Sequence, residues 1–197
     1  MCFNLFYPFI HNFQTQQMAL TQVFGQPQEL IESHAFEIII DTCEGTKFDF
    51  FVQLQSKIRI FFEVKLSENE FGHANNDRSH REKLRSIYIP RLTGNISAEL
   101  LEPQRFFRYY QLLRNISYIN PGNQDVLFFI FPERNQKITK EISDILKLVS
   151  PLLHPRIHIV FLEQLIKQIL QTKFCSDLRN LKHYLLFNEK YNGQILE

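Results

Sequence analysis

The chain has 197 residues, of which 44% are hydrophobic and 22% charged, a balance that excludes fibrous and disordered proteins. Its 20 Phe residues and absence of Trp indicate a phenylalanine-rich core, in a chain long enough to fold without disulfides or a structural metal. The formal net charge of +1 argues against a protein that coats a polyanion through its summed field.

The cysteines and the N-terminus indicate a compartment. Cys2, Cys43 and Cys175 stand far apart and form neither a disulfide framework nor a zinc motif, which favours a reducing environment. The opening MCFNLFYPFIHNFQ has no basic leading segment and no small-residue cleavage site, so we do not expect a signal peptide. No apolar stretch approaches the roughly 20 residues that a membrane-spanning helix needs. We therefore expect a cytoplasmic protein with no membrane partner.

The first third of the chain changes from a helical to an extended pattern. Residues 11–33 are Gln-rich with scattered apolar positions, which predicts a helix, a turn at Gly25 to Pro27, and further helix. Short apolar runs then predict three consecutive antiparallel strands, at residues 35–40, 47–54 and 58–66.

The rest of the chain alternates helices and strands. A polar loop is expected at 67–80, and the basic stretch 78–91 is expected to begin as a short helix. Apolar residues at helical spacing predict a helix over 104–117, and the apolar run 125–132 predicts a buried central strand. The remaining predicted elements are a helix at 137–149, a strand at 157–162, a helix at 163–172 and a final amphipathic helix.

This order of elements predicts the fold class. An antiparallel meander followed by alternating helices and strands is typical of an α/β fold, a mixed β-sheet with helices on both faces. We expect one domain over 1–197, made of an N-terminal helical segment (1–34), a core (35–131) and a C-terminal α/β extension (132–197).

The hairpin of the second and third predicted strands gathers charged residues. Side chains alternate along a strand, so Glu63 and Lys65 share one face of the third strand. In the second strand, Asp49 is expected on one face and Phe48 on the other. A three-residue turn at 55–57 then places Asp49 directly opposite Glu63. Two carboxylates and a lysine are therefore predicted on one face.

These three residues predict a metal-dependent hydrolytic site. Two carboxylates repel by about 4 kcal/mol at ~4 Å and an effective dielectric of 20, unless a cation or a proton lies between them. Mg²⁺ binds through one or two carboxylates while it keeps waters and accepts phosphate oxygens, which suits phosphodiester hydrolysis. Mn²⁺ is the expected substitute. The ammonium of Lys65 would hold the attacking water and offset charge on the phosphate.

The competing interpretation is a surface hairpin. There, the three charged residues would form an exposed cross-strand ion pair worth less than ~1 kcal/mol. Phe51 and Phe61 argue against it, because they flank the charged residues on the same face and large apolar residues favour the interior.

The order of elements and the residues on them resemble the PD-(D/E)XK nuclease superfamily, which has the restriction-endonuclease-like fold. The resemblance covers about residues 35–131 and rests on FDFF with Asp49, FFEVK with Glu63 and Lys65, the helix RFFRYYQLLRN and the strand VLFFIF. The stretch FFEVKLSENEFG followed by YYQLLRN is similar to a bacterial branch of this superfamily.

The resemblance implies roles for individual residues. Asp49 and Glu63 would be metal ligands, the carbonyl of Val64 a further ligand, and Lys65 the catalytic lysine. Gln111 would be a further catalytic residue, carried over from exonuclease-like branches that have Gln and Tyr four residues apart on this helix.

Two positions depart from the pattern of the superfamily. Phe48 precedes the Asp where many members have Pro. Gln111 is followed by Arg114 and Asn115, so only the Gln of the pair is carried over.

The net charge conceals a segregation. Residues 1–77 carry 4 basic and 10 acidic side chains, residues 78–114 carry 8 and 3, and residues 115–197 carry 10 and 8. The basic middle segment follows the proposed metal-binding hairpin and could contact a phosphate backbone, although a solvated basic face is equally open. Its basic residues are Arg78, Arg81, Lys83, Arg85, Arg91, Arg105, Arg108 and Arg114.

The sequence thus leads to three hypotheses. The first is a Mg²⁺-dependent (endo)deoxyribonuclease acting on DNA, with double-stranded DNA favoured. The alternative is a catalytically inactive member of the superfamily that binds nucleic acid or a protein. The third is a structural domain whose hairpin charges only add solubility. A homodimer stays open as an assembly.

Overall fold

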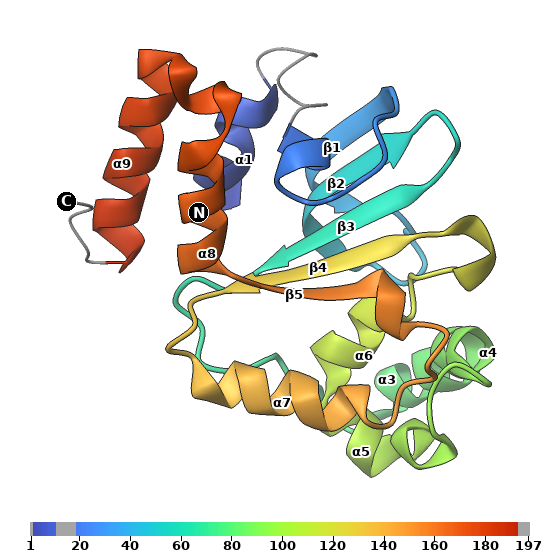
Figure 1. Cartoon of the computed structure of the whole chain (residues 1–197). Helices are drawn as coiled ribbons and strands as arrows, with labels where there is room; N and C mark the ends of the chain where they lie inside the picture. The colour runs from blue at the N-terminus through green and yellow to red at the C-terminus, as the bar shows by residue number, and fades with distance from the viewer. Residues whose placement is uncertain (1, 11–18, 193–197) are drawn as a thin grey trace.

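A computed structural model describes residues 2–10 and 19–192 of the chain (Figure 1). Its centre is a five-stranded sheet in the order β1-β2-β3-β4-β5. The first three strands pair antiparallel, and β3, β4 and β5 pair parallel. The strands are β1 (Ile31–Ile39), β2 (Lys47–Leu54), β3 (Arg59–Val64), β4 (Val126–Phe131) and β5 (Ile157–Phe161).

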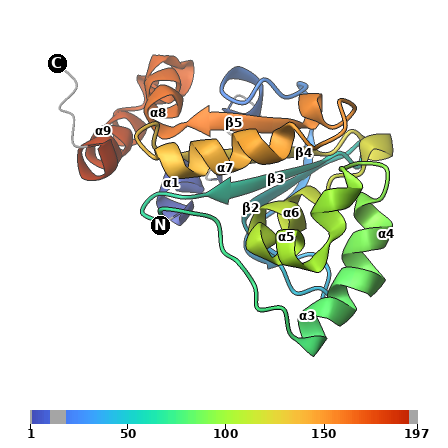
Figure 2. The same cartoon turned by 90° about the horizontal axis from the view of Figure 1, so that it is seen from below.

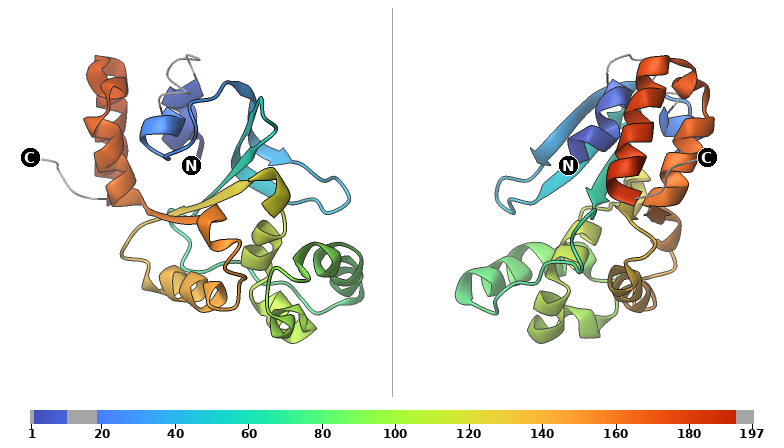
Figure 3. Two further views of the ribbon diagram at one scale, coloured as in Figure 1. Left: turned by 45° about the vertical axis from the view of Figure 1, so that its right-hand side comes forward. Right: turned by 90° about the vertical axis from the view of Figure 1, so that its left-hand side faces the viewer.

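Helices cover both faces of this sheet (Figures 1 and 3). One face is covered by α1 (Cys2–Ile10), α8 (Leu162–Gln171) and α9 (Leu178–Asn192). The other is covered by α3 (Arg78–Lys83), α4 (Ile89–Leu92), α5 (Pro103–Arg108), α6 (Tyr110–Ile116) and α7 (Gln136–Leu146), which Figure 2 shows from below. A π-helical turn, Leu84–Tyr88, joins α3 to α4, and short 3-10 turns occupy Ala98–Leu101, Pro121–Asn123, His154–Arg156 and Lys173–Ser176.

The predicted α/β class, a mixed sheet with helices on both faces, is confirmed and is consistent with a restriction-endonuclease-like core. In the described part of the chain, no helix combines the length and the apolar character required to cross a bilayer.

A row of rings in register crosses the whole sheet on the face covered by α1, α8 and α9. Phe36, Phe50, Phe62, Phe128 and His158 lie directly opposite one another on successive strands. The ring centroids of Phe50 lie 4.8 Å from those of Phe36 and 5.5 Å from those of Phe62. Phe128 lies 5.1 Å from Phe62 and 4.7 Å from His158. Aromatic pairs across strands stabilise one register over its alternatives.

A buried ion pair fixes the start of β3 against the start of β4. Asp125 is fully buried, and its carboxylate accepts hydrogen bonds from the backbone N–H of Arg59 at 3.1 Å and from the Arg59 guanidinium at 2.5 Å. The same carboxylate accepts from the backbone N–H of Asn120 at 3.0 Å. A charge buried in this way is stable only because all these donors surround it.

Two predicted elements differ from the structure, and one observed helix was not predicted. Residues 31–34, predicted as helix, open strand β1, and the 11–18 part of that helix lies outside the described residues. Helix α1 was not predicted. The single helix expected over 104–117 is interrupted at Tyr109, and the backbone N–H of Gln111 donates to the carbonyl of Gly72 at 2.9 Å.

The predicted facing of Phe48 is also wrong. Its ring lies with Phe51 and Phe61 in the core beneath α3 to α7, where it meets Tyr118 edge-on at 5.1 Å. Phe50 packs on the opposite face, so the strict alternation of β2 fails at its first residues. The neighbouring strand is irregular at the same level, since Glu37 has a positive φ of 47°. Phe48 pairs with Ile38 of β1 but lies beyond the part of β2 that pairs with β3, so the pleat constrains it from one side only.

The row of rings predicts a gradient of stability across the sheet. Phe62→Ala, at the fully buried centre of the row, should lower the free energy of unfolding by about 3–5 kcal/mol. The substitution removes a large ring and leaves a cavity that the surrounding strands cannot close. Phe36→Ala, in the edge strand, should cost less than half as much. Urea unfolding of both variants checks this, and equal costs would contradict a row anchored at its centre.

Candidate functional site

Three charged side chains meet where β2 begins and β3 ends. Asp49 is half-buried near the start of β2, and Glu63 and Lys65 lie at the end of β3 with 4% and 7% of their surface exposed. Because β2 and β3 are antiparallel, the beginning of one lies beside the end of the other. The structure therefore brings these residues together, and the burial of Glu63 and Lys65 is unlike an exposed surface ion pair.

Hydrogen bonds hold the group in place. The Lys65 ammonium lies 3.2 Å from Oε1 of Glu63, and the amide of Gln111 donates to the same oxygen at 2.6 Å. The backbone N–H of Val64 donates to Oδ2 of Asp49 at 2.7 Å. Lys65, Glu63 and Gln111 thus form one contact network, and Asp49 is bonded to Val64, the residue that follows Glu63.

The loop after β3 orients Gln111. The N–H of Gly72 donates to the Gln111 side-chain oxygen at 2.9 Å, so the amide nitrogen turns toward Glu63. A Cβ at position 72 would lie 3.3 Å from that oxygen, closer than ordinary contact, which explains a glycine there. The loop is tied down further by Phe71, whose backbone N–H donates to Glu141 of α7 at 3.0 Å.

The pKa values of both carboxyl groups in the site are raised. Burial, and then the charge of Asp49, raise the pKa of Glu63 to about 7, although Lys65 acts in the opposite direction. The pKa of Asp49 is raised as well, first by burial and also by Glu68 and Glu37. The positive charge of Lys65 is therefore too small to offset the burial and the negative charge that raise the pKa values of both carboxyls.

This oxygen-rich pair fits a divalent cation. A cation between Asp49 and Glu63 would offset the burial and the surrounding negative charge that raise both pKa values, and carboxylates suit Mg²⁺. Within the described ranges, no cluster of three or more His, Cys, Asp or Glu side chains is arranged to hold a metal ion. A metal here would therefore take its other ligands from backbone carbonyls, water and substrate.

A cleft of about 600 Å³ opens beside the site. It is lined by residues 66–69, which follow Lys65 directly, and by 132 and 134–137 after β4. Glu68 connects the two regions, since it lines the cleft and also acts electrostatically on Asp49. The lining carries Arg134 and Lys137, of which Lys137 pairs with Glu70.

The predicted basic residues divide into two groups. The exposed ones are Arg78, Arg81, Arg85, Arg105 and Arg108. Arg81 donates to Asn76 at 2.5 Å, and Arg105 pairs with Glu99 at 2.5 Å. Arg114 is partly buried, and its guanidinium lies 5.3 Å from the ring centroid of Tyr110.

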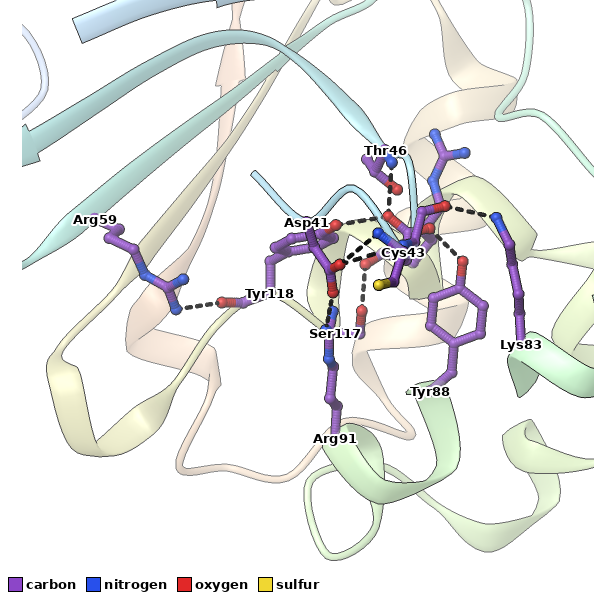
Figure 4. A network of polar contacts seen from close by, with 11 residues as sticks. Asp41, Cys43, Thr46, Arg59, Lys83, Tyr88, Arg91, Ser117 and Tyr118 are labelled. Carbon is purple, nitrogen blue, oxygen red and sulfur yellow. Dashed lines mark hydrogen bonds and ion pairs between the residues drawn. The ribbon is translucent and has the colours of Figure 1, made fainter. Parts of the chain in front are cut away.

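Lys83 and Arg91 make internal contacts (Figure 4). The Lys83 ammonium donates to the backbone carbonyl of Glu44 at 2.6 Å, and Arg91 pairs with Asp41 while its guanidinium stacks over Tyr118. Both therefore attach the β1–β2 connection to the helical layer. In this arrangement they are less available to a phosphate backbone than the exposed arginines.

The centre of that attachment is a buried carboxylate that the sequence analysis missed. Glu44 is 3% exposed and accepts from the Thr46 N–H at 2.7 Å, from the Tyr118 hydroxyl at 2.6 Å and from the Tyr88 hydroxyl. Burial acts to raise its pKa, but these hydrogen bonds outweigh burial, so the pKa of Glu44 is lowered. In the sequence Glu44 is one acidic residue in a turn, and no local pattern marks it.

Two further residues near the site, Glu37 and Asn115, had no predicted role. Glu37 occupies the β1 position opposite Asp49 in a left-handed conformation that non-glycine residues rarely adopt. Glu68 and Glu37 add negative charge around Asp49. Asn115 lies fully buried on α6, one turn after Gln111. Periodicity could have found Asn115, since a polar residue on the core face of a helix is an exception.

The raised pKa of Glu63 predicts a pH-dependent stability. Folding raises this pKa from 4.5 to about 7, so the protonated form is favoured and the metal-free protein loses stability as the pH rises through that range. Glu63→Gln stays neutral, so at pH 8 it should be more stable than the wild type by on the order of 3 kcal/mol. At pH 5 the difference should largely vanish. Urea unfolding at the two pH values measures it.

The exposed Glu82→Gln on α3 is the matched control and should change stability equally at both pH values. At pH 8, Mg²⁺ should stabilise the wild type and leave Glu63→Gln unchanged. If the free energy of unfolding changes with pH in the same way for the wild type and Glu63→Gln, the pKa of Glu63 is not raised by folding.

Comparison with known proteins adds a family to this geometry. Neither the curated proteins nor the solved structures contain a match to the chain. A family model described as "Restriction Endonuclease associating with ARP" matches residues 1–192, and the chain therefore belongs to this restriction-endonuclease-like family.

Proposed function

We propose that the chain is a metal-dependent nuclease of the PD-(D/E)XK type that hydrolyses DNA phosphodiester bonds. The observation that carries the proposal is the burial of Glu63 and Lys65 in contact with each other, beside Asp49 and under the amide of Gln111. Such a costly arrangement of charges is typical of functional sites. Family membership supports a nuclease-like role and DNA as the substrate.

Asp49 and Glu63 would hold Mg²⁺, with Mn²⁺ as the substitute and the carbonyl of Val64 as a further ligand. A bound divalent cation would supply Lewis-acid stabilisation of phosphate charge and a water of lowered pKa. Both carboxyls have raised pKa values in the metal-free protein, so they gain most from a cation.

Lys65 would orient the attacking water and stabilise the negative charge that develops on the phosphate. Its ammonium lies 3.2 Å from Oε1 of Glu63 and 5.8 Å from the ring centroid of Phe71, and these two contacts hold it in place. The water loses one proton to solvent as its oxygen bonds to phosphorus, the bond from phosphorus to the leaving sugar oxygen breaks, and that oxygen takes up one proton from solvent. Gln111 would keep the Glu63 carboxylate in one orientation.

The DNA would run through the cleft beside Lys65, where Arg134 and Lys137 lie, and toward the basic helices. Arg78, Arg81, Arg85 and Arg108 are exposed and available to phosphates, and Lys83 and Arg114 would join only if their internal contacts rearrange. We propose double-stranded DNA as the better substrate and a homodimer as the assembly. The family description also names an association with ARP, which we extend to this chain as a proposal.

One observation favours the alternative, a catalytically inactive module that binds nucleic acid or protein. The described residues contain no cluster of three or more His, Cys, Asp or Glu side chains suited to a metal. Failure of the wild type to bind Mg²⁺ or Mn²⁺ at millimolar concentration would favour this alternative.

The proposed site predicts which substitutions abolish cleavage. Asp49→Ala and Lys65→Ala should each lower Mg²⁺-dependent cleavage of duplex DNA at least 100-fold, because each removes a group that acts on the reacting phosphate. The exposed ion pair of Asp144 and Lys147 supplies matched controls, and Asp144→Ala and Lys147→Ala should cleave at the wild-type rate. Cleavage that survives in both site variants would rule out this assignment.

A further inference from the structure

Asn115 is a polar residue in a position that otherwise calls for an apolar one. It is fully buried on α6, and its helical neighbours Leu112, Leu113 and Ile116 belong to the core. Neither the amide nitrogen nor the amide oxygen of Asn115 has a hydrogen-bond partner among the described residues. Buried polar groups in folded proteins are nearly always paired, so an unpaired amide demands an explanation.

Folding alone does not explain this amide. An apolar residue of similar size at this position would avoid the loss of hydration without any loss of hydrogen bonds. The amide does lie near one polar group, because its proximity is among the causes that lower the pKa of Glu63, although the two side chains fall short of hydrogen-bond geometry. The position therefore makes physical sense only in relation to the site.

One of the two oxygens of the Glu63 carboxylate has no hydrogen-bond donor in the part of the chain that the structure describes. Gln111 and Lys65 both contact Oε1, and no described residue donates a hydrogen bond to Oε2. Gln111 and Asn115 are one helical turn apart, so their side chains project from the same side of α6. Of the two amide side chains that act on Glu63, Asn115 is the one whose donor makes no hydrogen bond with the described residues.

We propose that Asn115 is a positioning residue, whose amide N–H holds the second oxygen of the Glu63 carboxylate when the site takes up its divalent cation. Together with Gln111 it fixes both oxygens, so that the carboxylate meets the cation in one orientation. This inference rests on the proposed function. It adds a residue that the resemblance left without a role, since only the Gln of the Gln–Tyr pair was carried over.

Two isosteric variants isolate the donor. Asn115→Thr keeps a hydroxyl that can donate, whereas Asn115→Val has the same shape and no donor. Mn²⁺ affinity, measured by calorimetry without DNA, should be at least 10-fold weaker in Asn115→Val than in Asn115→Thr, because partners that orient a metal ligand commonly contribute 10–100-fold to affinity. Urea unfolding should find Asn115→Val at least as stable as Asn115→Thr.

Leu113→Ala is the matched control on the same helix, since Leu113 is fully buried in the core and outside the contact network of the site. It should lower stability and leave Mn²⁺ affinity at the wild-type value. Equal Mn²⁺ affinities of Asn115→Val and Asn115→Thr, in a wild type that binds Mn²⁺ and cleaves DNA, would overturn the inference and leave the proposed function intact. A wild type that neither binds Mn²⁺ nor cleaves DNA would overturn the proposed function, and the inference with it.

Discussion

The register of the sheet is the constraint on which the site depends. The rings of Phe36, Phe50, Phe62, Phe128 and His158 lie opposite one another on five successive strands. Next to this row, Glu63 faces the helix that carries Gln111, and Asp49 lies close to it, bonded to the backbone N–H of Val64. A slip of one residue in the pairing would move every side chain of a strand to the other face of the sheet. The packing of the rings disfavours such a slip, and it thereby also keeps the two carboxylates together. The ion pair of Asp125 with Arg59 fixes the same register between β3 and β4.

The helical layer adds Gln111 to these aligned strands and thereby completes the site. The backbone N–H of Gln111 leaves the helical ladder to bond the carbonyl of Gly72, which separates α5 from α6 and draws the loop after β3 onto α6. The Gly72 N–H in return orients the Gln111 amide toward Glu63. The break in the helix and the position of the amide therefore have one cause. Helical periodicity cannot reveal it, because the partner lies 39 residues away in the chain.

Local rules predicted the hairpin and failed where distant contacts decide. A three-residue turn suffices to set Phe50 opposite Phe62, which brings Asp49 near Glu63, because both belong to one short hairpin. Phe48 breaks the alternation, since Tyr118, 70 residues later, offers its ring a place in the other core. The sparse apolar residues of 31–34 predict helix, but pairing with β2 overrides this local propensity and makes the segment a strand. Glu44 gave no signal, since its partners Tyr88 and Tyr118 are also distant.

Glu44 and Glu63 are two buried carboxylates with opposite responses to acid. The lowered pKa of Glu44 means that its contribution to stability is lost as the pH falls below the ordinary range of a glutamate, whereas the raised pKa of Glu63 means that stability is lost as the pH rises toward 7. As far as these two groups decide it, the metal-free chain is most stable in mildly acid solution, between the two windows. A cation that neutralises the charge of Glu63 would move the pH of maximal stability toward 7. That pH would therefore report whether a cation is bound at the site.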